Sequence, residues 1–221
     1  FQSLSAVSSS LNKVINAQVH IKEFMEFDKI SAVRNPNYLN LTKSDKVELK
    51  NIDFKFLNSK EYIFKNLNLE IDKNTHNIIV GPNGSGKSTL LGLLGNVITP
   101  ESGKLFTYSE KFAYIGASPF IFNTTLRKNI SYGNPNQVSD SQMIQILKDF
   151  HLFNEDSSYD LDSIVNNRSL SSGQMQKIAF IRAFLYKPEI LLLDESLANL
   201  DDNSTNLIMS LISQQKITLI N

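Results

Sequence analysis

The sequence contains no cysteine, which excludes disulfide bridges and thiolate metal sites and agrees with a reducing compartment. Acidic and basic residues balance at 22 each, so the chain lacks the positive excess that is typical of surfaces that bind nucleic acid. No apolar run approaches the roughly 20 residues that cross a bilayer, and no leader with a charged start and an apolar core opens the chain. We therefore expect no nucleic-acid partner and, by default, exposure to the cytosol.

Hydrophobic residues make up 41% of the 221 residues, which is ample for a folded core. Residues 1–31 carry apolar side chains near heptad positions over 4–27, which predicts an N-terminal amphipathic helix whose apolar stripe needs a partner. The polar, turn-prone stretch 32–45 is interpreted as a linker, and residues 46–221 as one further domain. Because the chain begins with Phe1 rather than Met, we also expect it to be part of a longer protein.

Strand and helix patterns alternate through residues 46–221, which predicts an α/β fold. Alternating apolar residues over 47–56 and 63–71 predict an antiparallel β flap. The β-branched run at 78–80 predicts a strand that leads into a glycine-rich loop. Residues 117–170 are expected to form a mostly helical subdomain, inserted between the two strand-forming halves of the domain.

Further signals fix the second half of this α/β order. Ser139 and Gln142 form a capping-box pattern, which predicts the start of a helix. A longer helix is predicted over 172–186, and the apolar run at 190–193 predicts a fully buried strand. Residues 216–221, KITLIN, predict the last strand of the domain.

Residues 80–94, VGPNGSGKSTLLGLL, satisfy the pattern G-x-x-x-x-G-K-[ST] with Gly81, Gly86, Lys87 and Ser88 at the fixed spacing. Apolar residues at helical spacing follow the loop, so the loop would lie at the positive end of a helix. The glycines let several N–H groups face one concavity, while the lysine adds a cation and the serine a hydroxyl for Mg²⁺. We predict a P-loop NTPase core of the RecA-like kind, in which the nucleotide is bound by Gly81, Pro82, Asn83, Gly84, Ser85, Gly86, Lys87, Ser88 and Thr89.

Two carboxylates, Asp194 and Glu195, follow the apolar strand predicted at 190–193. Asp194 is positioned, as in P-loop enzymes generally, to hold Mg²⁺ opposite Ser88, so we predict these two residues as metal ligands. Glu195 points elsewhere and is suited to orient and activate the attacking water. Glu195 and Lys87 are therefore the predicted catalytic residues.

Two further motifs carry a resemblance to a known family. Residues 170–174, LSSGQ, precede the long helix, and residues 196–201, SLANLD, follow Glu195 directly. Together with the P-loop and the paired carboxylates, they make residues 45–221 resemble the ATP-binding cassette (ABC) ATPases, whose signature is usually written LSGGQ. Ser172 stands in place of the first glycine of that signature. The signature residues are Leu170, Ser171, Ser172, Gly173 and Gln174, and the D-loop residues are Ser196, Asn199 and Asp201.

The resemblance implies ATP and Mg²⁺ as ligands and a head-to-tail dimer, in which one subunit's P-loop and the other subunit's signature enclose each ATP. A second ABC ATPase domain is therefore the expected partner, and a homodimer is the first expectation. Ser171 and the N–H groups around Gly173 would lie at the positive end of a helix, which suits a γ-phosphate. Phe56 falls where the family keeps an aromatic residue that stacks on adenine, with Tyr62 as the other candidate.

Residues 112–133 resemble the exporter stretch that follows the Q-loop, and the helix predicted at 4–27 resembles the end of an exporter's last membrane helix. This implies ATP hydrolysis that powers export, a transmembrane domain in the same polypeptide, and a position at the cytoplasmic face of the inner or plasma membrane. Because the sequence departs from the family pattern at two places, we expect the coupling of the ATPase domain to membrane helices to be unusual. Ala117 stands at the Q-loop glutamine without an oxygen for Mg²⁺ or water, and residues 165–168, VNNR, replace an acidic loop. The sequence does not name the cargo.

Two alternative functions stay open on the sequence. A soluble ABC ATPase of DNA repair or translation would need no membrane helices, but the chain lacks a basic surface. A small-molecule P-loop kinase would use arginine clamps, and the chain has only four arginines.

The family places a histidine shortly after the strand predicted at 216–221, whereas the histidines here are His20, His76 and His151. We therefore expect the ATPase domain to be C-terminally truncated and its activity to be low.

Overall fold

The structure, a computed structural model, describes residues 37–57, 59–135, 137–153 and 159–221. The N-terminal helical extension predicted at 1–31 lies outside these residues. The chain divides into one unit, Phe1–Asn37, and a second unit, Tyr38–Asn221, which contains all the elements given below. Within the described residues, no helix combines the length and the apolar character needed to cross a membrane.

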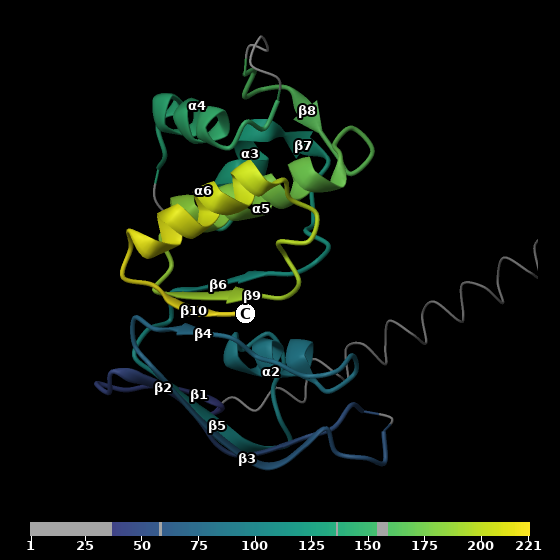
Figure 1. Ribbon diagram of the computed structural model, residues 1–221, viewed down its shortest axis with the longest axis vertical. Coiled ribbons are helices and arrows are strands. Elements are labelled where there is room, and N and C mark those ends of the chain that lie inside the picture. Colours follow the sequence, from purple (N-terminus) through teal and green to yellow (C-terminus); the bar gives the residue numbers. More distant parts are fainter. Residues whose placement is uncertain (1–36, 58, 136, 154–158) are drawn as a thin grey trace, which may run out of the picture. The chain divides into compact units, whose positions relative to one another are not determined.

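The central sheet of the domain is parallel and has the strand order β4-β10-β9-β6 (Figure 1). Its strands are β4 (His76–Asn77), β10 (Thr218–Ile220), β9 (Ile190–Leu193) and β6 (Phe112–Ile115). β9 is buried along its whole length, as is typical of a strand in a parallel sheet with both faces covered. The buried strand that the sequence predicts at 190–193 is therefore confirmed.

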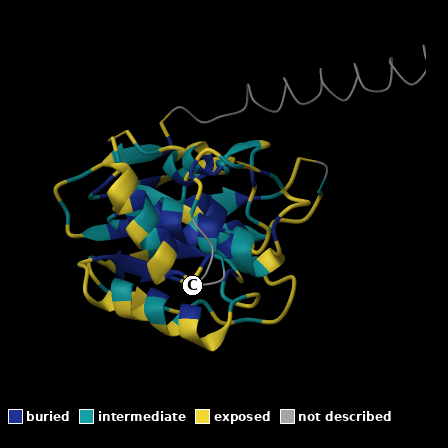
Figure 2. Ribbon diagram, turned by 90° about the horizontal axis from the view of Figure 1, so that it is seen from above, coloured by how far each residue is buried: buried dark blue, intermediate teal, exposed yellow. Residues whose placement is uncertain are grey.

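The two faces of this sheet belong to separate hydrophobic cores, because side chains alternate along a strand. Ile190 and Leu192 pack into one core, while Leu191 and Leu193 pack into the other. The covering helices are α2 (Lys87–Leu94) on one face, and α5 (Ser172–Tyr186) and α6 (Asp202–Ser213) on the other. Figure 2 shows the buried residues gathered inside the domain and the exposed ones at its rim. The sheet is thus the middle layer between α2 and the remaining helices.

A second sheet, with the order β1-β5-β2-β3, forms the flap on the far side of α2 (Figure 1). Its strands are β1 (Leu39–Leu41), β5 (Ser102–Thr107), β2 (Lys46–Phe54) and β3 (Phe64–Asp72). β2 pairs antiparallel with both β3 and β5, whereas β1 pairs in parallel with β5. The sequence analysis did not identify β5, because Leu105 is the one buried hydrophobic residue in this strand.

The linker predicted over 32–45 is wrong in its C-terminal part. Tyr38 is 1% exposed, and its hydroxyl donates a hydrogen bond of 2.9 Å to the carbonyl of Leu93. Leu39 is paired with Leu105 in the flap sheet. The side chains of Tyr38 and Leu39 therefore pack into the domain, which begins at Tyr38 rather than at residue 46.

The strand predicted at 78–80 lies two residues earlier than expected. β4 ends at Asn77, which is paired with Ile220, and the side chains of Ile78 and Val80 are exposed. The N–H of Ile79 still donates a bond of 2.6 Å to the carbonyl of Asn221. The β-branched run at 78–80 therefore follows β4 rather than forming it, because the last residue of β4 that pairs with β10 is Asn77.

The inserted region at 117–170 is less helical than predicted. Its described residues form the helices α3 (Leu126–Ser131) and α4 (Asp140–Asp149) and the strand pair β7 (Thr124–Thr125) and β8 (Ile164–Val165). The predicted capping box of α4 is confirmed, with the Ser139 hydroxyl 3.3 Å from the N–H of Gln142 and the Gln142 amide oxygen 3.1 Å from the N–H of Ser139. Gly133, at a φ of 76°, and Pro135 separate the two helices.

Helix α6 begins at a cap that also connects it to α5. Asp201 accepts bonds of 2.8 Å from both the N–H and the hydroxyl of Ser204, and Lys177 of α5 lies 3.1 Å from the Asp201 Oδ2. These donors, with the Ser204 N–H first, hold the pKa of Asp201 well below its usual value. A lowered pKa adds stability above the unfolded carboxyl pKa of about 3.9, and this stability is lost as the pH falls toward the folded value.

We predict that Asp201→Asn lowers the free energy of unfolding at neutral pH by about 0.5 to 1 kcal/mol, because the ion pair of the exposed Asp201 carboxylate with the mostly buried Lys177 is lost while the amide still caps the helix. The difference from wild type should shrink below about pH 4, where the wild-type carboxyl takes up its proton. Urea unfolding at several pH values measures this, with Asp202→Asn as the matched control at the next residue. A difference that does not change between neutral and acid pH would contradict the assigned role.

Candidate functional site

The glycine-rich loop runs from β4 into α2, in the order that the sequence predicts. Gly84 and Gly86 have φ angles of 82° and 95°, a region that residues with a Cβ rarely adopt. A Cβ on Gly86 would also lie 2.8 Å from the Cγ2 of Ile63. Gly86 precedes α2 without a side-chain cap, so the N–H groups of the first turn are left to an external acceptor.

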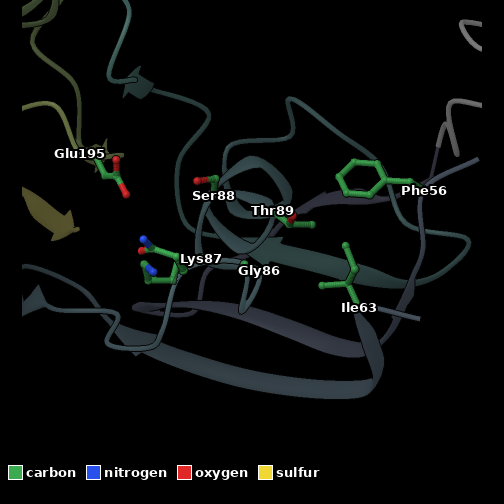
Figure 3. A pocket seen from close by; sticks show the side chains of 9 residues that line it. Phe56, Ile63, Gly86, Lys87, Ser88, Thr89 and Glu195 are labelled. Carbon is green, nitrogen blue, oxygen red and sulfur yellow. The ribbon is translucent and has the colours of Figure 1, made fainter. Parts of the chain in front are cut away.

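A cavity of about 300 Å³ opens over this loop. Figure 3 shows Glu195 on one side of it and Phe56 with Ile63 on the other. The lining residues are Phe56, Ile63, Asn83, Gly84, Gly86, Lys87, Ser88, Thr89 and Glu195. Most of the residues predicted for nucleotide binding are therefore gathered around one cavity, whereas the sequence analysis missed Ile63.

Phe56 and Tyr62, the two aromatic candidates for adenine stacking, lie in different surroundings. Phe56 lines the cavity, is 54% exposed, and packs edge-to-face on Phe54 with their ring centroids 5.2 Å apart. Tyr62 instead donates a bond of 2.9 Å from its hydroxyl to Glu101, and Lys55 Nζ lies 4.9 Å from its ring centroid. Of the two, Phe56 has its ring available to a ligand in the cavity.

The side chain of Lys87 folds back onto its own loop. Its Nζ donates bonds of 2.9 Å and 3.1 Å to the carbonyls of Gly81 and Pro82. Both acceptors are neutral carbonyls, so they do not compensate the positive charge of the ammonium at the edge of the cavity. Exchange of these weak acceptors for phosphate oxygens would give stronger, charge-assisted bonds.

Ser88 and Asp194 are brought together across the ends of α2 and β9. The Ser88 hydroxyl donates a bond of 2.9 Å to the Asp194 Oδ1, and the Tyr114 hydroxyl donates a bond of 2.8 Å to the Asp194 Oδ2. Burial, and then the bond to Asp194, raise the pKa of Tyr114 above its usual value, so the phenol remains a donor at neutral pH. The sequence analysis missed Tyr114, because nothing local to this residue indicates that β6 pairs with β9.

The oxygens of Ser88 and Asp194 fit a hard cation such as Mg²⁺, which is usually held by one or two carboxylates together with substrate phosphates. Among the described residues, no group of three or more His, Cys, Asp or Glu side chains could form a dedicated metal cage. This donor set therefore suits a metal that arrives with a nucleotide better than a permanent structural ion.

Glu195 is exposed, lines the cavity, and has a φ of 52°. A positive φ is uncommon for a residue with a side chain, and such strain is concentrated at functional sites. Glu195 lines the cavity (Figure 3), whereas Asp194 does not line it and is hydrogen-bonded to Ser88 and Tyr114. The two neighbouring carboxylates thus have different surroundings, as the sequence analysis expects.

The residue at the Q-loop position, Ala117, is exposed and belongs to another cavity, of about 280 Å³. That cavity is lined by Ala117, Ser118, Pro119, Phe120, Asn167, Ser172, Met175 and Asn199. It therefore joins the Q-loop position with one signature residue and one D-loop residue, and none of these lines the cavity over the glycine-rich loop.

The signature forms the start of α5 and lies apart from the P-loop of its own chain. Leu170 is buried, and Ser171 caps the helix, its hydroxyl 3.2 Å from the N–H of Gln174. Gln174 completes a capping box and also donates a bond of 3.1 Å to the carbonyl of Leu152. The Gln174 side chain is thus engaged within the domain, while Ser171 and Ser172 are exposed at the positive end of α5.

The three D-loop residues have different environments. Ser196 is 2% exposed, and its hydroxyl has no hydrogen-bond partner among the described residues. Asn199 is exposed, and its carbonyl lies 3.0 Å from the position that a Cβ on Gly173 would take. Asp201 is the N-cap of α6. The D-loop therefore lies directly against the signature of the same chain.

Comparison with known proteins identifies a family. The profile of the family described as ABC transporter matches residues 64–198. An export ATP-binding/permease protein of Rickettsia prowazekii is 36% identical in an alignment of 209 residues, and the match covers 85% of this chain and 35% of that protein. ABC transporter B family member 13 of Arabidopsis thaliana is 32% identical in an alignment of 197 residues, and the match covers 81% of this chain and 16% of that protein.

A solved structure of a bacterial Atm1-family ABC exporter with ATP bound is similar to this chain, with a TM-score of 0.71 and 25% identity, over 84% of this chain and 35% of that one. The chain thus spans 35% or less of the length of each of these relatives. The predicted P-loop α/β fold and the predicted resemblance are confirmed by these matches. The chain belongs to the ABC transporter family, and the matched residues form its nucleotide-binding domain.

Proposed function

We propose that this chain binds ATP with Mg²⁺ and hydrolyses it, and that the energy powers export of a substrate across a membrane. The observation that carries the proposal is the hydrogen bond of 2.9 Å from the Ser88 hydroxyl to the Asp194 Oδ1, beside a cavity that Ser88 lines together with Lys87 and Glu195. The names of the relatives support export, since one is an export ATP-binding/permease protein and another an Atm1-family ABC exporter.

In this proposal the loop holds the phosphates of ATP. The N–H groups of the loop and of the first turn of α2 are directed at the phosphates, and Lys87 supplies the cation. The residues assigned to this role are Gly81, Pro82, Asn83, Gly84, Ser85, Gly86, Lys87, Ser88 and Thr89. Phe56 stacks on the adenine, an interaction worth about 1 to 3 kcal/mol for bases in nucleic-acid complexes.

Ser88 and Asp194 would hold Mg²⁺, which neutralises charge on the phosphate oxygens when it is bound. Glu195 accepts a proton from the attacking water and orients it. Its backbone geometry keeps this carboxylate on the cavity side, separate from the one assigned to the metal. The division of roles between two adjacent acids follows from their different directions.

A second ABC ATPase domain, in the first instance a second copy of this chain, completes the site. The signature residues Leu170 to Gln174 would contribute to the ATP held by that copy, through the exposed positive end of α5. Ser196, Asn199 and Asp201 would carry the D-loop between the two sites. This partner accounts for a signature that does not reach the P-loop of its own chain.

A transmembrane domain in the same polypeptide is the second proposed partner, with the ATPase domain at the cytoplasmic face of the inner or plasma membrane. Residues 1–31 are proposed as the end of the last helix of that domain. We also propose that turnover is slow. Ala117 offers no polar side chain, and neither described histidine, His76 or His151, lines the cavity over the loop. One missing transition-state donor costs about 10² to 10³ in rate.

We predict that Lys87→Ala weakens ATP binding by about 10- to 100-fold or more, because hydrogen bonds to charged groups contribute about 1.5 to 3 kcal/mol. Isothermal titration calorimetry with ATP and Mg²⁺ measures the change. Lys104→Ala, which removes the same charge from an exposed position on β5, is the matched control and should bind as wild type does. Equal affinities for all three proteins would exclude the loop as the ATP site.

Glu195→Gln is expected to preserve ATP affinity and to slow hydrolysis by about 10²- to 10⁴-fold, since an amide cannot act as a base. Phosphate release measures the rate, and Glu189→Gln, at the other end of β9, is the matched control. If the slow variant retains ATP, it should also form a dimer that depends on ATP, detected by size-exclusion chromatography with light scattering. Hydrolysis at the wild-type rate would show that the base lies elsewhere.

A further inference from the structure

Tyr114 is the residue at the metal-binding oxygens that neither the sequence motifs nor the proposed function assigns to a role. Its hydroxyl donates a bond of 2.8 Å to the Asp194 Oδ2, on the opposite side of the carboxylate from the bond of 2.9 Å donated by Ser88. Each oxygen of Asp194 thus has one donor. The two hydroxyls together fix the rotation of the carboxylate group.

The pairing of β6 with β9 places this hydroxyl. Tyr114 is in register with Leu192, two residues before Asp194, and the N–H of Asp194 donates a bond of 2.9 Å to the carbonyl of Ile115. A Cβ built on Gly116 would lie 3.5 Å from the Tyr114 ring, in ordinary contact. Strand pairing fixes the backbone on both sides of the hydrogen bond, so the phenol reaches Asp194 from a supported position.

Both donors to Asp194 are uncharged, which matters for a site that receives a cation. A lysine or arginine at the same distance would neutralise the carboxylate and compete with the metal. A phenol or an alcohol fixes the direction of the carboxylate and leaves its negative charge in place. Among the described residues, no ion pair within 4.0 Å is formed by Asp194.

Position 117, where the family resemblance leads one to expect a glutamine, has an alanine and lies outside the cavity over the loop. Ala117, in the segment after β6, therefore has no polar side chain to offer. Tyr114, three residues earlier and in β6 itself, donates a hydrogen bond to Asp194. We propose that Tyr114 is a positioning residue, whose hydroxyl holds the Asp194 carboxylate in the orientation that receives Mg²⁺ with ATP. This inference rests on the proposed function of the same site.

A hydroxyl at this position can also have the opposite effect, which is to hinder metal binding by Asp194. The experiment described below distinguishes the two effects. If the hydroxyl occupied the Asp194 oxygen that the metal needs, it would block metal binding. Its removal would then lower the Mg²⁺ concentration that gives half of the maximal effect on ATP affinity. A positioning hydroxyl has the reverse effect, because a carboxylate without its hydrogen-bond partner binds metal about 10- to 100-fold more weakly.

The experiment measures the ATP affinity of the full chain as Tyr114→Phe, by calorimetry, in EDTA and at rising Mg²⁺ concentration. We expect an unchanged affinity in EDTA, a Mg²⁺ concentration for half of the maximal effect that is about 10-fold higher than in wild type, and wild-type affinity at saturating Mg²⁺. Recovery at saturating Mg²⁺ also shows that the variant is folded. Tyr132→Phe, which removes a hydroxyl from another exposed tyrosine, is the matched control.

Four results would overturn the inference. A half-effect Mg²⁺ concentration equal to that of wild type would remove the role of the hydroxyl, and a lower one would show that it acts as a block. A loss of affinity already in EDTA would show that the hydroxyl serves the nucleotide or the fold rather than the metal ligand. If ATP binding by the wild-type chain does not respond to Mg²⁺ at all, the proposed function fails together with the inference.

Discussion

The site depends on one structural constraint, which is the parallel pairing of β9 with β10 on one side and β6 on the other. β9 is four residues long and wholly buried, so its position in the sheet is fixed by contacts on both faces. Because carboxyl ends of parallel strands lie at the same edge of a sheet, Asp194 and Glu195 emerge at the same edge as the segments that follow β6 and β4. The glycine-rich loop, the oxygens of Ser88 and Asp194, and Tyr114 meet at that edge for this reason.

Two packed layers complete the site from opposite directions. The core between α2 and the flap sheet holds the loop helix in place, and it contains Tyr38, whose hydroxyl bonds to the carbonyl of Leu93. The same flap carries Phe56 to the rim of the cavity. On the other face, α5 and α6 bring the signature and the D-loop into contact, through Lys177 with Asp201 and through Gly173 with Asn199. The cavity over the glycine-rich loop and the signature therefore lie apart within the chain.

The hydrogen-bonding groups of Asp194, of the glycine-rich loop and of the signature differ in how many of their bonds are already made within the chain. The Asp194 carboxylate has a donor on each oxygen, whereas the ammonium of Lys87 is bonded to neutral loop carbonyls. The signature serine Ser171 is already engaged as a helix cap. The Asp194 carboxylate is thus held in one orientation, while the positive charge of Lys87 is not compensated by its acceptors.

The sequence by itself determined the features that depend on neighbours along the chain. The loop pattern, the capping box at Ser139, and the buried run at 190–193 are local, so the residue types alone predicted them. Tertiary structure decided the rest. It placed β1 inside the predicted linker, ended β4 before 78–80, gave Phe56 rather than Tyr62 to the cavity, and brought Tyr114 to Asp194. These outcomes depend on pairing and packing between residues far apart in the chain, and nothing in the local sequence carries that information.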